Sequence, residues 1–178
     1  MIKLKHSDII ALLMKKLPFY ASGLKFSCKR CSSCCRYDAG FVFLSENDMN
    51  SLASALKIDT NVLLNLYCRW VTDFRGEEVL SLKEKSNKDC ILWGVCGCTV
   101  YDSRPLQCVT FPFWESIVSS CENWELAASG CPGINQGKLH TKNEINENMK
   151  MRDQQPIIKR EAFKSGIEKR SFRSTGGE

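Results

Sequence analysis

A run of eight residues, Cys28-Lys-Arg-Cys-Ser-Ser-Cys-Cys35, brings four cysteines close together in the chain. The first three lie three residues apart and the fourth follows directly, so the run ends in a doubled cysteine. Cysteines at this spacing form short turns whose backbone N–H groups point at bound sulfur, a common setting for thiolate metal ligands. The run therefore predicts a metal site, but it fixes neither the metal nor whether the metal does chemistry or holds the fold.

The chain has 11 cysteines, and whether they form disulfides or bind metal depends on the cell compartment in which the protein lies. The N-terminus is basic, but its apolar run from Ile9 to Met14 is cut by Lys15 and is short for a signal peptide. Ser7 can cap a helix there, so we predict a short amphipathic helix instead. No stretch reaches the ~18 apolar residues of a membrane span. We therefore expect a cytoplasmic protein without a membrane partner, whose reduced thiols bind metal.

The net charge of +5 is concentrated at the C-terminal end. Residues 134–178 carry 10 Lys and Arg against 6 Asp and Glu, a net charge of +4. Residues 1–133 carry 15 Lys and Arg against 14 Asp and Glu, a net charge of +1. A basic tail is more often a solvated surface than a binding arm. Nucleic acid is therefore not the expected partner; a zinc-finger-like protein that bound it would show strongly salt-dependent affinity.

Helical spacing and capping residues predict two helices between the cysteine blocks. Residues 40–44 form a compact apolar run that we interpret as a short strand. Ser45 and Asp48 resemble a capping box, which would open a helix over about 46–57. A further helix is expected to start at residue 59 or 60 and to end near 67.

The rest of the chain predicts a hairpin and several short helices and strands, and together these elements indicate the fold class. Two apolar segments around a turn predict a hairpin within 68–82. Pro105 suits the start of a short helix that ends before Phe111. We expect a strand pair over 114–126 and one or two marginal helices in 134–178. The predicted fold is a small, irregular, cysteine-rich α+β metal-binding domain with short helices and a β-hairpin.

Four segments carry a resemblance to a known family. They are Phe26 to Arg36, Gly40 to Asp48, Cys98 to Phe113 and Cys131 to Gly133. The second reads Gly-x-Val-x-Leu-Ser-x-x-Asp, and the third reads Cys-x-x-Tyr-x-x-Arg-Pro-x-x-Cys-x-x-Phe-Pro-Phe. In this order they resemble the YkgJ-type cysteine cluster proteins. These are also described as the CxxCxxCC zinc- or iron-chelating domain, or as Fe–S-cluster-containing proteins.

The resemblance implies a set of metal ligands and a division of the chain. The ligands it implies are Cys28, Cys31, Cys34, Cys35, Cys90, Cys98, Cys108 and Cys131. Residues 26–133 would form the metal-binding domain. Residues 1–25 would form an N-terminal helix and connection, and 134–178 a basic, weakly structured tail. Three cysteines lie off the pattern: Cys68, Cys96 and Cys121.

The thiol count permits more than one kind of centre. Zinc takes four thiolates in a closed structural site, and a [4Fe–4S] cluster also takes four cysteines. Cys34 and Cys35 could serve different sites or bridge two metals, or one of them could be a small buried hydrophobe. Arg104 could tune the centre by donating to its sulfurs or by pairing with Asp102. The other interpretation of Arg104 is a structural salt bridge at a helix start.

No catalytic constellation can be recognised in the sequence. It holds no Walker A, Gly-x-Gly-x-x-Gly or Gly-x-Ser-x-Gly motif, and its two histidines, His6 and His140, lie outside the matched segments. The sequence thus predicts a protein that binds zinc or iron through two sets of thiolates, in a structural or chelating role. The alternative is an Fe–S oxidoreductase or electron-transfer protein. Whether the protein is an enzyme stays open, and no protein partner can be named.

Overall fold

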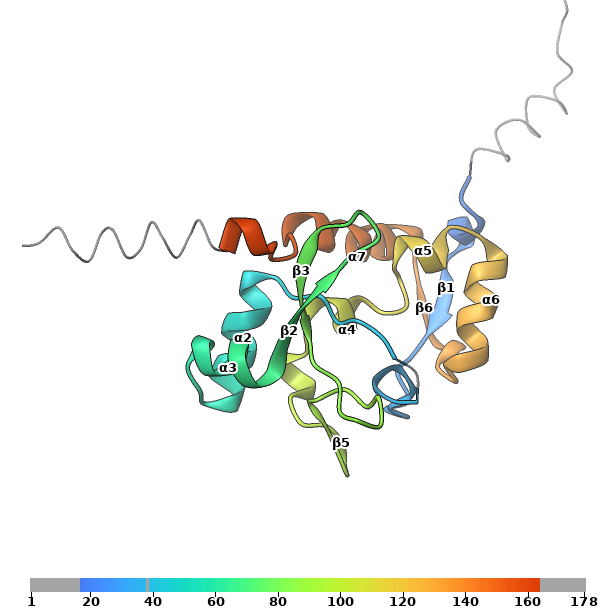
Figure 1. Cartoon of the computed structure of the whole chain (residues 1–178). Coiled ribbons are helices and arrows are strands. Elements are labelled where there is room, and N and C mark those ends of the chain that lie inside the picture. Colours follow the sequence, from blue (N-terminus) through green and yellow to red (C-terminus); the bar gives the residue numbers. More distant parts are fainter. Residues whose placement is uncertain (1–16, 38, 164–178) are drawn as a thin grey trace, which may run out of the picture. The chain divides into compact units, whose positions relative to one another are not determined.

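The computed structural model describes residues 17–37 and 39–163 (Figure 1). Within them the chain forms two compact units. Unit 1 consists of 17–31 and 110–150, and unit 2 of 32–37, 39–109 and 151–163. The described helices and three two-stranded antiparallel sheets make an α+β fold, as the sequence predicts. The predicted N-terminal helix lies mostly outside the described residues, and the three-part division of the chain stays a prediction.

Unit 1 is built on one strand pair with helices beside it. Its elements are η1 (Phe19–Ser22), β1 (Leu24–Phe26), α5 (Glu115–Val118), α6 (Cys121–Gly130), β6 (Ile134–His140) and most of α7 (Lys142–Gln154). Figure 1 shows α6 beside the antiparallel strands β1 and β6. The core of this unit consists of Phe113, Val118, Trp124, Ile134 and Ile145.

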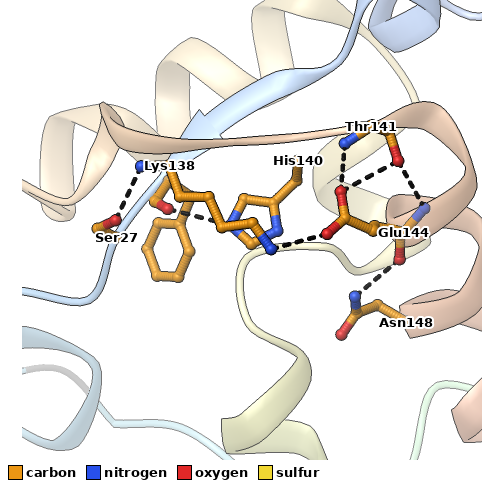
Figure 2. Close-up of polar contacts among 7 residues, drawn as sticks. Ser27, Lys138, His140, Thr141, Glu144 and Asn148 are labelled. Carbon is orange, nitrogen blue, oxygen red and sulfur yellow. Dashed lines mark hydrogen bonds and ion pairs between the residues drawn. The ribbon is translucent and has the colours of Figure 1, made fainter.

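The β1–β6 pair contains an irregularity that requires a glycine. Leu24 pairs with His140, but Phe26 pairs with Ile134, so β6 bulges between these positions. Gly137 lies in the bulge with a φ of 74°, and a Cβ placed there would lie 2.1 Å from Ser27 Oγ. The same hydroxyl accepts a hydrogen bond of 3.0 Å from the backbone N–H of Lys138 (Figure 2). The bulge thus depends on a residue without a side chain.

Unit 2 contains the second hydrophobic core and most of the cysteines. Its elements are η2 (Ser33–Cys35), α2 (Glu46–Leu56), α3 (Thr60–Tyr67), β2 (Cys68–Thr72), β3 (Glu78–Leu82), β4 (Trp93–Gly94), β5 (Gly97–Cys98), η3 (Tyr101–Ser103) and nearly all of α4 (Leu106–Thr110). The buried apolar residues of its core include Leu44, Leu52, Leu63, Leu80, Leu92 and Val100. Within the described ranges, no helix is long and apolar enough to cross a membrane.

Several predicted elements are present at the predicted places. The Ser45 hydroxyl accepts from the Asp48 N–H, and the Asp48 carboxylate accepts from the Ser45 N–H, which completes the capping box of α2. Asp59 caps α3 through the N–H of Asn61. The hairpin of β2 and β3 and the short helix α4 after Pro105 are also confirmed.

The structure contradicts the predictions of a strand over 40–44 and of a strand pair over 114–126. Residues 40–44 form only an isolated bridge between Phe43 and Ser81, because much of this segment's main chain is bonded by side chains. Residues 114–126 form α5 and the first part of α6 rather than a strand pair. Ser120 caps α6 by accepting from the N–H of Asn123. Helical phasing then buries Trp124 in the core of unit 1.

The chain beyond residue 133 contributes structure to both units. In unit 1, residues 134–150 supply β6 and most of α7. In unit 2, Ile158 donates to the Leu44 carbonyl over 2.9 Å and accepts from the Leu80 N–H over 3.0 Å. Phe163, five residues further on, also packs in unit 2: the centre of its ring lies 5.6 Å from the centre of the Trp70 ring. We call residues 156–163 the C-terminal strap.

Candidate metal centre

Unit 2 contains five of the eight predicted ligands. They come from η2, the β4–β5 hairpin with the loop before it, and α4, and they are Cys34, Cys35, Cys90, Cys98 and Cys108. The other three predicted ligands, Cys28, Cys31 and Cys131, belong to unit 1. All 11 cysteines lie within the described residues, and none of them forms a disulfide.

A main-chain hydrogen bond joins the two cysteine blocks inside unit 2. The N–H of Cys90 donates to the carbonyl of Cys35 over 2.8 Å. The turn that carries Cys35 is closed by a bond of 2.9 Å from its own N–H to the Ser32 carbonyl. Ser32 has a φ of 65°, a left-handed conformation that costs a residue with a side chain about 1–2 kcal/mol. The doubled cysteine is thus held in a tight turn directly beside Cys90.

The hairpin of β4 and β5 fixes Cys98 close to Cys90. Trp93 pairs with Cys98 across the two strands, and Gly94 pairs with Gly97. The N–H of Trp93 donates to the Cys90 carbonyl over 2.9 Å, so Cys90 closes a turn into the same hairpin. These bonds place the two thiols on one short supersecondary element.

Helix α4 positions Cys108 through side chains that reach its first turn. The Asp48 carboxylate, nearly buried in α2, accepts from the Leu106 N–H over 2.7 Å. Gln107 accepts from the Phe43 N–H over 2.9 Å and donates to the Phe41 carbonyl over 2.8 Å. The residues before Cys108 are therefore bonded to two other segments of unit 2. The sequence predicts the capping box of Asp48 but gives no sign of its bond to α4.

Hydrogen bonding within the doubled cysteine separates the pKa values of its two thiols. The two Sγ atoms lie 3.7 Å apart. The hydrogen bond from Cys35 lowers the pKa of Cys34 to about 6, and the positive charge of Arg104 lowers it further. The same hydrogen bond, followed by burial, raises the pKa of Cys35. Cys34 is thus ready to bind a cation at neutral pH.

The thiols of unit 2 affect one another's protonation. Burial raises the pKa of Cys108, and negative charge on Cys34, Cys90 and Cys98 raises it further. Burial also raises the pKa of Cys90, with added effects from Cys98 and Cys34. A bound cation would remove this repulsion, because metal ligation favours the thiolate form.

Arg104 supplies a positive charge beside these thiols. Its guanidinium carbon lies 3.6 Å from the centre of the Tyr101 ring. Its Nε is buried and has no hydrogen-bond partner in the described part of the chain. Within those residues Arg104 forms no ion pair with Asp102, so the salt bridge considered from the sequence is absent. A buried donor without a partner fits a site whose sulfurs become anionic when they bind metal.

The donor chemistry fits a metal, although the sulfurs are not gathered into a coordination shell. Among the described residues, no three His, Cys, Asp or Glu side chains lie close enough to hold a metal ion. The five thiols of unit 2, the charge of Arg104 and its unpaired Nε are nevertheless the groups that a thiolate centre requires. Soft thiolate ligands favour zinc, copper(I) or iron–sulfur centres over magnesium or calcium.

A family comparison identifies the domain that carries these cysteines. The model of the CxxCxxCC family, described as "Putative zinc- or iron-chelating domain", matches residues 27–154. The chain belongs to this family. The resemblance found in the sequence is therefore confirmed, and the family description supports metal binding.

The CxxCxxCC protein also has a relative of similar sequence. It is "Uncharacterized protein MJ0661" from Methanocaldococcus jannaschii, which is 34% identical over 103 residues. The match covers 56% of this chain and 52% of the relative, so the chain spans about half the length of that protein. No solved structure matches the chain.

The remaining cysteines of the CxxCxxCC protein lie in varied settings. In unit 1, the backbone N–H of Arg30 donates to Cys28 Sγ over 3.4 Å, as expected in a thiolate-binding turn. Cys68 is buried in the core of unit 2, and burial raises its pKa to about 11. Cys96 and Cys121 are exposed. Cys68 therefore serves packing, in agreement with its place outside the family pattern.

Proposed function

We propose that this CxxCxxCC protein binds zinc or iron through its cysteine thiolates, in a structural or chelating role. The observation that carries the proposal is the presence of five cysteines on three segments of unit 2, two of which are joined by the hydrogen bond from the Cys90 N–H to the Cys35 carbonyl. This bond lowers the entropic cost of bringing those two segments to one site. We also propose a reducing compartment, such as the cytoplasm, in which cysteine thiols stay able to bind metal.

The proposed ligands fall into two groups, one argued from the structure of unit 2 and the other from the family resemblance. Cys34, Cys35, Cys90, Cys98 and Cys108 are proposed from their placement in unit 2, and Arg104 as the residue that offsets their negative charge. Cys28, Cys31 and Cys131 are proposed from the family resemblance alone. A four-coordinate metal uses four thiolates, so Cys34 and Cys35 need not bind the same ion.

A second candidate function is electron transfer by a [4Fe–4S] cluster. The observation that favours it is the buried Nε of Arg104, without a partner in the described chain. Hydrogen bonds to the sulfurs of such clusters tune their reduction potential. The same donor would serve a zinc site, so only the bound metal separates the two candidates.

Anaerobic purification followed by metal analysis tests the proposal. Metal content, acid-labile sulfide and the visible spectrum should be measured on the full chain. Colourless protein with stoichiometric zinc and no sulfide excludes the cluster; brown protein with sulfide and reversible reduction excludes a purely structural zinc site. The proposal would be refuted if the purified protein contained neither zinc nor iron and took up neither metal on reconstitution.

Serine variants identify the ligands. Cys108→Ser should lose metal or bind it at least about 10-fold more weakly, because it removes a thiolate. Cys121→Ser is the matched control, since Cys121 is exposed and lies outside the family pattern. Cys28→Ser tests the part of the ligand set that the sequence alone proposes. Unchanged metal content in either the Cys28 or the Cys108 variant would remove that residue from the ligands.

A further inference from the structure

The indole of Trp93 presents a buried hydrogen-bond donor that the described chain does not use. Its Nε1 is buried and has no hydrogen-bond partner among the described residues. Leaving such a donor unpaired is energetically costly, so natural proteins rarely retain one without a reason. Two other tryptophans of the chain do bond this atom: Trp114 donates to Thr110 Oγ1 and Trp124 to Asn135 Oδ1.

The backbone places Trp93 beside two proposed ligands. Trp93 lies directly opposite Cys98 in the β4–β5 pair. Side chains that face each other across an antiparallel pair extend from the same face, with Cβ atoms about 4.5–5.5 Å apart. The N–H of Trp93 also bonds the Cys90 carbonyl, so the residue is flanked by both cysteines.

Two cations lie over the Trp93 ring and strengthen its N–H as a donor. The guanidinium carbon of Arg36 lies 4.0 Å from the ring centre, and Nζ of Lys85 lies 5.5 Å from it. Asp89, whose side chain is only 3% exposed, holds Arg36 through a contact of 3.3 Å. A cation over an aromatic face attracts its π electrons. The indole N–H is therefore more positive than that of an isolated tryptophan.

We propose that Trp93 Nε1–H donates a hydrogen bond to the metal-bound thiolate of Cys98 and so acts as a positioning residue of the metal centre. The inference rests on the proposed metal binding. A cysteine sulfur that binds a metal carries negative charge and accepts hydrogen bonds strongly. Metal binding would therefore give the buried Trp93 donor a partner on the neighbouring strand.

Cadmium substitution gives a direct test of this bond. The full chain is loaded with ¹¹³Cd²⁺, a thiophilic probe, and the indole ¹⁵N–¹H signals are recorded before and after loading. The Trp93 indole proton should move downfield and show a scalar coupling to ¹¹³Cd across the hydrogen bond. The indole signals of Trp114 and Trp124 should show no coupling. A loaded protein whose Trp93 proton neither moves nor couples would overturn the inference.

Zinc affinity supplies the second readout. Trp93→Phe removes the donor, and partners of metal ligands typically affect affinity by about 10–100-fold, so we expect zinc to bind at least about 10-fold more weakly. Trp70→Phe is the matched control in the same unit, because Trp70 packs on Phe163 and lies in the other hairpin. Its affinity should match that of the unchanged protein.

A shape-preserving replacement separates the donor from packing. Site-specific incorporation of 3-benzothienylalanine at position 93 exchanges the N–H for sulfur and keeps the bicyclic ring. It should weaken zinc binding as much as Trp93→Phe does; full affinity would show that only the ring matters and would refute the inference. Failure of the unchanged protein to bind any metal is a separate result, which would refute the proposed function itself.

Discussion

The carboxylate of Asp48 accepts a hydrogen bond of 2.7 Å from the backbone N–H of Leu106. Its other oxygen accepts from the N–H and the hydroxyl of Ser45 over 2.8 and 2.7 Å. One nearly buried carboxylate therefore serves the N-termini of both α2 and α4. Because Cys108 lies two residues after Leu106, Asp48 links the capping of α2 to the position of a proposed ligand.

We expect Asp48→Asn to destabilise unit 2. An amide has one acceptor oxygen, so its NH₂ group would face N–H donors that the carboxylate now satisfies. Leaving a buried donor unpaired costs about 1–3 kcal/mol, and the free energy of unfolding should fall by that amount. Urea unfolding measures it, and hydrogen exchange at the Leu106 amide should become faster.

Asp59→Asn provides the control for this change. Asp59 caps α3 by accepting from the N–H of Asn61 over 2.7 Å, and it lies at the surface. Asparagine caps helices about as well as aspartate does, so we expect a loss below about 0.5 kcal/mol. Equal effects of the two variants would show that the bond from Asp48 to Leu106 contributes nothing special.

The sequence predicts α2 well because its capping box is local. The signal lies within four residues, and apolar spacing of 3.6 residues follows it. The bond from Asp48 to Leu106 joins residues 58 positions apart, and no local pattern encodes such a pair. The same holds for the amide of Gln107, which bonds the main chain of 41–43 and helps to leave only an isolated bridge where a strand is predicted.

Residues 114–126 show where periodicity fails. Aromatic and aliphatic residues there suit a strand as well as two short helices, and short apolar segments do not distinguish the two. The packing of Trp124 against Phe113 in the core of unit 1 selects the helix. The cysteine spacing, in contrast, identifies the family directly, because ligand identity depends on residue type and order rather than on secondary structure.

Glu144 provides a pH-dependent contribution to the stability of unit 1. It accepts from Lys138 Nζ over 2.7 Å and from the N–H and hydroxyl of Thr141 (Figure 2). These contacts, led by the one with Lys138, lower the pKa of Glu144 from its usual 4.5 to about 2. The contribution is therefore complete above about pH 4.5 and is lost as the pH falls through 2.

Comparison of Glu144→Gln with the unchanged protein measures this contribution. Glutamine keeps the length of the side chain and suits a capping box, but it carries no charge. The variant should be less stable at pH 7, and the difference in unfolding free energy should shrink to zero as the pH falls from 4.5 to about 2. Glu147→Gln, which removes a charge without an ion pair in the described chain, should show no such trend. A difference that stays constant with pH would contradict the prediction.

The C-terminal strap should stabilise unit 2. Ending the chain at Gln155 removes both main-chain bonds of Ile158, the contact of Phe163 with Trp70 and the surface ion pairs of the strap. Main-chain bonds contribute about 1 kcal/mol each and an aromatic pair about 0.5–1.5, so we expect a loss of about 2–4 kcal/mol in the free energy of unfolding. A chain ending at Phe163 keeps these contacts and is the reference against which the loss is measured. Equal stability of the two truncated chains would show that the strap does not contribute.

Gly137 should tolerate no side chain. An alanine Cβ would meet Ser27 Oγ at 2.1 Å and Ser27 Cβ at 2.4 Å, at a φ of 74°. The left-handed conformation costs about 1–2 kcal/mol and overpacking a further 1–3, so Gly137→Ala should destabilise unit 1 by about 2–5 kcal/mol. The bond from the Lys138 N–H to Ser27 Oγ should be lost, with faster hydrogen exchange at that amide.

Two other glycines separate the conformational cost from the steric one. Gly76 has a φ of 81° with open space around its Cβ position, so Gly76→Ala should cost only about 1 kcal/mol. Gly130 lies in α6, where a Cβ would meet nothing within 4 Å, so Gly130→Ala should be neutral or stabilise by up to about 1 kcal/mol. Unfolding in urea measures all three variants. If Gly137→Ala cost no more than Gly76→Ala, the close approach of Ser27 to the β6 bulge would not constrain the fold.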